Sequence, residues 1–88
     1  MASVKHLKKN INHVLGDIIE ECYMWELMNP KESTKKSEAI IDEAIAVFDE
    51  LIAELHIKNI ENKKAHYKSV SLTLEKKAKD LVAKVNAL

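Results

Sequence analysis

Residues 4–30 read VKHLKKNINHVLGDIIEECYMWELMNP, and their apolar side chains recur at spacings of three and four. This period predicts a helix of about residues 3–28 that is buried along one stripe, with Ser3 as its N-cap. Asn29-Pro30 ends the helix, because the residue before a proline is pushed out of the helical region. The stripe comprises Val4, Leu7, Ile11, Val14, Leu15, Ile18, Cys22, Trp25 and Met28.

Two further apolar stripes lie beyond this break and predict helices of about residues 31–58 and 60–87. Asn29 is a candidate N-cap for the middle helix, with Ser33 or Ser37 as alternatives. Residues 69–74 alternate like a strand, but the helical period continues through them and an isolated strand has no partner. The middle stripe comprises Ile40, Ile41, Ala44, Ile45, Phe48, Leu51, Ile52 and Leu55. The last comprises Ile60, Tyr67, Val70, Ser71, Leu74, Ala78, Leu81, Val82, Val85 and Leu88.

The distribution of charge predicts how the helices are oriented. Residues 37–55 contain six acids and no lysine, whereas residues 58–88 contain eight lysines and three acids. The first helix is basic at its start and acidic toward its end, where Lys31, Lys35 and Lys36 of the next helix would lie beside its glutamates. This complementarity favours an antiparallel, up-down-up three-helix bundle, in which the acids of the middle helix neutralise the lysines of the last.

Composition limits the classes of function. Eighty-eight residues amount to a single domain, 1–88, and one glycine and one proline leave little from which to build a phosphate-binding loop. The net charge is zero, every basic residue is lysine, and the single cysteine excludes an intramolecular disulfide. The amino terminus lacks the apolar core of a signal peptide and no apolar run is long enough to span a membrane, so we expect a cytoplasmic protein.

The chemical signals are weak. His13, Asp17 and Glu21 follow one another at i,i+4 spacing and form the best candidate metal site, although a solvated helix face explains the same pattern. Cys22 lies within the apolar stripe, where a cysteine is normally a small inert hydrophobe. The sequence therefore predicts no catalytic residue and no cofactor.

The last helix is the candidate for nucleic-acid binding. Its lysines can contact phosphates, but without arginine the chain lacks the forked donor that reads guanine edges bidentately. The lysines that would form this surface are Lys63, Lys64, Lys68, Lys76 and Lys77.

The end of the first helix carries apolar side chains on more than one face. To keep these side chains out of water, other helices must pack against more than one face of it. The residues concerned are Tyr23, Met24, Trp25, Leu27 and Met28, and tyrosine, tryptophan and methionine are enriched in interface cores. Either the last helix of the same chain or another chain covers them. We expect a non-catalytic interaction or assembly module that forms a homodimer, as a larger helical bundle, or binds another helical protein. The alternatives are a nucleic-acid-associated accessory protein and, third, a small helical enzyme or metal-binding protein.

Overall fold

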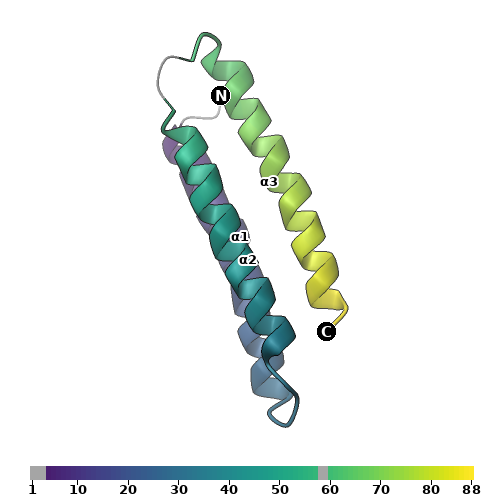
Figure 1. The fold of residues 1–88 in the computed structure, drawn as a ribbon. Coiled ribbons are helices and arrows are strands. Elements are labelled where there is room, and N and C mark those ends of the chain that lie inside the picture. The colour runs from purple at the N-terminus through teal and green to yellow at the C-terminus, as the bar shows by residue number, and fades with distance from the viewer. Residues whose placement is uncertain (1–3, 58–59) are drawn as a thin grey trace.

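The computed structural model describes residues 4–57 and 60–88, which form three helices (Figure 1). These are α1 (Val4–Met28), α2 (Lys35–Leu55) and α3 (Lys63–Asn86), packed up-down-up in a bundle with extents of 52 × 19 × 17 Å. The predicted all-α three-helix bundle is confirmed, and the alternating segment 69–74 is helical. The predicted N-cap Ser3 and the linking residues Lys58 and Asn59 lie outside the described residues.

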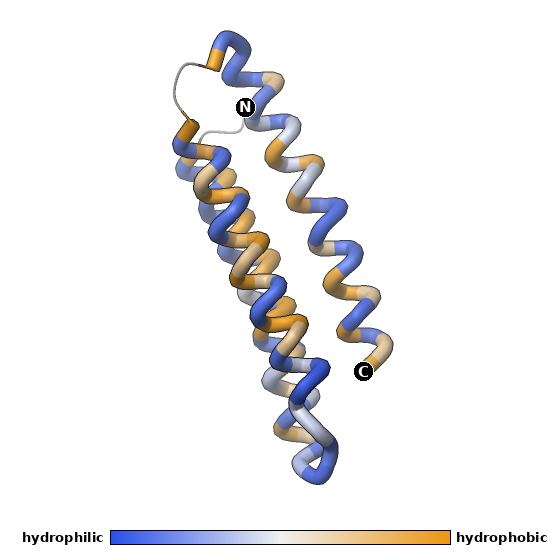
Figure 2. Tube along the Cα trace, in the orientation of Figure 1, coloured by the Kyte–Doolittle hydropathy of each residue, from blue (hydrophilic) through white to orange (hydrophobic). Residues whose placement is uncertain are grey.

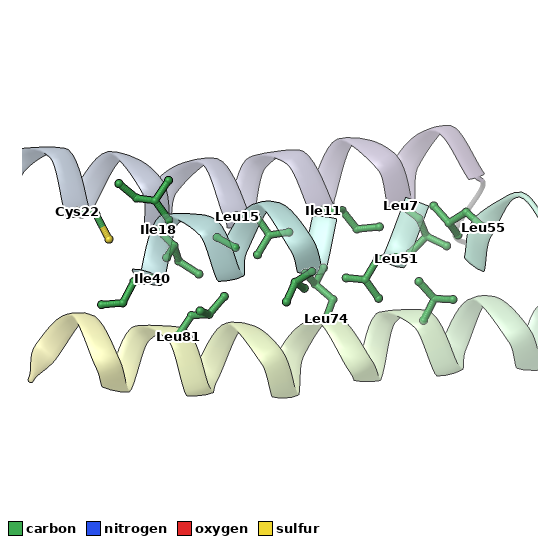
Figure 3. Packing of buried hydrophobic residues seen from close by; sticks show 14 residues of the cluster. Leu7, Ile11, Leu15, Ile18, Cys22, Ile40, Leu51, Leu55, Leu74 and Leu81 are labelled. Atoms are coloured by element: carbon green, nitrogen blue, oxygen red, sulfur yellow. The ribbon is translucent and has the colours of Figure 1, made fainter. Parts of the chain in front are cut away.

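One apolar core runs along the bundle where the three helices meet. Figure 3 shows its side chains filling the space between the helices, and the tube coloured by hydropathy shows apolar positions recurring along each helix (Figure 2). All three helices contact one another, and α1 and α2 form the most extensive pair. The core consists of Leu7, Ile11, Leu15, Ile18, Cys22, Ile40, Ile41, Ala44, Val47, Leu51, Leu55, Val70, Leu74 and Leu81.

The buried face of α2 is rotated from the one predicted. Val47, which the predicted stripe omits, is buried, whereas Ile45 is 47% exposed and Phe48 is only half-buried. The reason is that α2 packs against α1 and α3 at once, so its most buried line points between those two helices. Ile45 and Phe48 consequently lie at the edge of the α1–α2 contact, on the side away from α3.

The link between α1 and α2 is a turn, so the prediction that the middle helix begins at residue 31 is wrong. The Asn29 side-chain amide donates to the Trp25 carbonyl oxygen at 2.9 Å and the Glu32 amide donates to the Asn29 carbonyl oxygen at 3.0 Å. Asn29 therefore satisfies the carboxyl end of α1 instead of capping α2. Thr34 occupies the N-cap position without a side-chain hydrogen bond.

The link between α2 and α3 is also longer than predicted. α2 ends at Leu55, not at residue 58, and α3 begins at Lys63, not at residue 60. The Asn62 side chain accepts a hydrogen bond from the Ala65 amide at 3.1 Å, which satisfies one of the free amides of the first turn. One turn later, His66 Nε2 donates to the Glu54 carbonyl oxygen at 2.7 Å and joins the start of α3 to the end of α2.

Two leucines of equal size test the position of the core. Leu51 is 1% exposed, whereas Leu72 is 56% exposed on α3. Leu51→Ala should lower the free energy of unfolding by about 2–5 kcal/mol because it leaves a cavity. Leu72→Ala should change it by no more than about 0.5 kcal/mol. Urea denaturation measures both, and equal losses would contradict the placement of α2.

Candidate interaction surfaces

α3 ends before the α1–α2 hairpin does, as the carboxyl-terminal end of the ribbon shows (Figure 1). Leu88 lines a groove together with Ile40 of α2, and Val85 lines another with Glu21 of α1. α1 continues from Glu21 to Met28, which is about 10 Å at the helical rise. This last part of the hairpin is therefore two helices thick.

Because α3 does not reach the last part of the α1–α2 hairpin, apolar side chains there are exposed to solvent. Tyr23 is 57% exposed, Met24 51%, and Leu27 and Met28 each 75%, while Trp25 is half-buried. We call these five residues the hairpin-end patch. The alternative that the last helix covers them is wrong, and so is the placement of Met28 on the buried stripe, because α3 ends too early.

A buried polar contact fixes the backbone beneath the patch. Ser37 is fully buried in the first turn of α2, and its hydroxyl lies 2.6 Å from Glu26 Oε1 and 2.9 Å from the Thr34 carbonyl oxygen. Both neighbours accept, so the single hydroxyl proton is donated to one of them at a time. The contact with Glu26 ties α2 to the last turns of α1. Helical periodicity did not predict it, because the two residues are far apart in sequence.

Charged residues near the patch form no ion pair with any described residue. Glu20, Glu21, Lys31, Lys35 and Lys36 are all exposed. In residues 4–57 and 60–88, the ion pairs are His13–Asp17 and Lys84–Glu43. The expected pairing of the late glutamates of α1 with the early lysines of α2 is therefore not found in this part of the chain.

The candidate metal site is not assembled. His13 Nε2 lies 3.6 Å from Asp17 Oδ2, with side chains 77% and 62% exposed. Asp17 and Glu21 line a groove beside Val82 and Val85 of α3, and His13 does not line it. No three His, Cys, Asp or Glu side chains among the described residues are placed to hold a metal ion. His13 and Asp17 form a solvated i,i+4 pair.

Cys22 is fully buried at the end of the core row of α1. Burial raises the pKa of its thiol, and the nearby carboxylates of Glu26 and Glu21 raise that pKa further. All three effects oppose formation of the thiolate, the nucleophilic form. The side chain thus acts as a packing group.

The lysines of α3 are mostly free of the acids of α2. Lys84 Nζ lies 2.6 Å from Glu43 Oε2 and forms the ion pair between these helices in the described residues. The predicted neutralisation of the lysines is thus limited to one pair there. The lysines that remain exposed include Lys63, Lys64, Lys68, Lys76 and Lys77.

An apolar groove of about 180 Å³ lies along the α1–α2 contact and is lined by no α3 residue. It passes over Gly16, the only glycine of the chain, which is exposed in the middle of α1. A Cβ atom at Gly16 would meet nothing within 4 Å apart from its chain neighbours and the adjacent backbone of α1. We call this surface the Gly16 groove, and its lining residues are Asn12, Leu15, Gly16, Ile19, Ile45 and Phe48.

The raised pKa of Cys22 predicts how stability changes in alkali. The unfolded thiol ionises near pH 8.5, whereas the folded thiol stays neutral to a higher pH. The stability gained by keeping it neutral is fully present below the unfolded pKa and is lost as pH rises through the folded pKa. In urea denaturation, wild type should therefore lose more stability than Cys22→Ala between pH 7 and 10. A constant difference between the two proteins would contradict this.

The described helices include none that is both long and apolar enough to cross a bilayer. No family model matches the chain, and neither a curated protein nor a solved structure shows significant similarity to it.

Proposed function

We propose that this protein is a non-catalytic helical interaction module that forms a homodimer through the hairpin-end patch. The observation that supports the proposal is the exposure of four large apolar side chains side by side on the part of the bundle that α3 leaves uncovered. Clustered exposed apolar residues mark interaction sites in soluble proteins, whereas single ones do not.

The charges around the patch favour a second copy as the partner. A two-fold interface uses the same surface on both subunits, so that surface must complement itself. Glutamates on α1 and lysines on α2 flank the patch in similar number and are unpaired within the described chain. Rotation of one copy by 180° places the glutamates of each beside the lysines of the other.

The size of the patch also agrees with such an interface. Four of its five side chains are at least half exposed, and the largest apolar patch on a typical monomer, about 300–600 Å², is often functional. A standard interface buries about 800 Å² from each partner. The patch would form the apolar centre, and the surrounding charged side chains would form the polar rim.

Truncation of Met24 and Leu27 tests the proposed dimer. Both side chains are at least half exposed and lie outside the core, so their loss should leave the folded monomer intact. Met24→Ala combined with Leu27→Ala should weaken dimerisation at least about thirty-fold, since central interface anchors are commonly worth about 2 kcal/mol or more. Sedimentation velocity over a wide concentration range measures the change.

Leu72→Ala is the control, because it removes an apolar side chain that is also more than half exposed, but lies on α3, and it should leave dimerisation unchanged. A wild-type sedimentation coefficient that stays at the monomer value throughout would disprove the homodimer.

A nucleic-acid-associated role is the second candidate, and the exposure of the α3 lysines favours it. Among the described residues only Lys84 is paired with an acid of α2, so the other lysines are available to phosphates. Such contact would be independent of base sequence, because lysine positions phosphates without reading bases.

Reversal of Lys68 and Lys76 to glutamate tests this candidate. Both are exposed and make no ion pair with a described residue, so the double variant should melt within a few degrees of wild type. If α3 binds nucleic acid, wild type should shift duplex DNA in a gel near physiological salt and the variant should not. Lack of any shift by wild type at low salt would eliminate the candidate.

A further inference from the structure

We propose that the hairpin-end patch of each subunit docks into the Gly16 groove of the other, with Leu27 of one copy packed over Gly16 of its partner and the two α1 helices antiparallel. This inference rests on the proposed homodimer and adds the surface that receives the patch.

The position of Gly16 is the first argument. Glycine within a helix costs about 1 kcal/mol relative to alanine, so it usually serves a purpose. Within the monomer none is found: a Cβ would have open space around it, and the backbone needs no positive φ there. The remaining purpose of a helical glycine is the close approach of another group, and no described residue of the chain supplies that group.

The relation of Leu27 to Gly16 is the second argument. They are eleven residues apart, which is close to three helical turns, so both project from the same face of α1. They lie about 16 Å apart along the axis. Two antiparallel α1 helices in contact over this length bring each Leu27 opposite the other Gly16. The two-fold axis generates the same Leu27–Gly16 contact twice, so the assembly is complete with two subunits.

The charge at the edge of the groove is the third argument. Asp42 and Asp49 lie three residues before and four after Ile45, so they stand on the same side of α2, and both are exposed. The hairpin end carries exposed Lys31 in the turn that follows α1 and exposed Lys35 at the start of α2. When a two-fold axis relates two antiparallel α1 helices, the α2 helices of both copies lie on the same side of the α1–α1 contact. In this arrangement the lysines of each copy approach the aspartates of the other.

The apolar surface is continuous from the groove to the patch. Tyr23 follows Ile19 by one turn and Gly16 by two, and it belongs to the patch. Ile45 and Phe48 offer partly exposed apolar surface on the α2 side. The proposed contact would cover these two side chains of α2, which the sequence predicts to be in the core but which the monomer leaves partly exposed.

Substitution of Gly16 distinguishes the groove from the patch. Gly16→Leu adds a Cβ atom that has open space around it and replaces glycine by a better helix former, so the melting temperature at low concentration should be equal to or above that of wild type. Dimerisation should weaken by at least about tenfold, because the added side chain occupies the place of Leu27. Asn10→Leu is the matched control. It adds the same side chain at an exposed position six residues before Gly16, about 120° away around α1, and should leave dimerisation unchanged.

The outcomes separate this inference from the proposed function. If Gly16→Leu dimerises like wild type while Met24→Ala/Leu27→Ala does not, the patch mediates dimerisation but the groove does not receive it, and the inference is wrong. If wild type is monomeric at all concentrations, both the dimer and the inference are wrong.

Cysteine cross-linking gives a positive test in the Cys22→Ala background. Gly16→Cys combined with Leu27→Cys should give a covalent dimer under mild oxidation, because residues 16 and 27 of opposite copies come within disulfide reach. Neither single substitution should do so, because like positions lie well apart in the antiparallel arrangement. Cross-linking of either single variant as efficiently as the double variant would overturn the proposed register.

Discussion

The row of α1 side chains from Leu7 to Cys22 is the surface on which both other helices depend. α2 and α3 contact each other less than α1 and α2 do, and the core residues of both are directed toward the space in front of this row. A chain of fewer than about 100 residues buries a smaller fraction of its surface than a larger domain does, so few alternative sites exist for an apolar core. Loss of contact with α1 would leave α2 and α3 without enough buried surface to remain folded.

Much of this arrangement is readable from local sequence. The periodicity of residues 4–28 and the Asn29-Pro30 break predict the carboxyl end of α1 at its observed position, Met28, because both signals act within a few residues of each other. The ends of α2 and α3 were predicted less well. Thr34, the N-cap of α2, makes no side-chain hydrogen bond, so little in the sequence marks the start of that helix. Asn62 does cap α3, but the apolar period continues past it to Ile60 and so predicts an earlier start.

Other features depend on contacts between distant residues and could not be derived from periodicity. Val47 is buried because α2 packs against α1 and α3 at the same time. The apolar stripe of a single helix does not show from which directions two neighbouring helices pack against it. The hydrogen bonds of Ser37 with Glu26 and of His66 with Glu54 join residues on different helices. The exposure of the hairpin-end patch depends on where α3 ends relative to α1, which is a property of the packed bundle. The sequence shows that the patch contains residue types enriched in interfaces, but it does not show that α3 leaves them exposed.

The two-helix end of the hairpin makes resistance to local opening uneven along the bundle. Backbone amides in the middle are protected by three packed helices and exchange with solvent only when most of the chain unfolds. Amides near Met28 are held by one neighbouring helix and a single buried serine contact, so a small fluctuation that releases Ser37 from Glu26 exposes them. Slow-exchanging and fast-exchanging amides should thus divide near the level of Cys22. Anything that binds the hairpin end would order the segment that the fold itself holds least firmly, at a cost in conformational entropy.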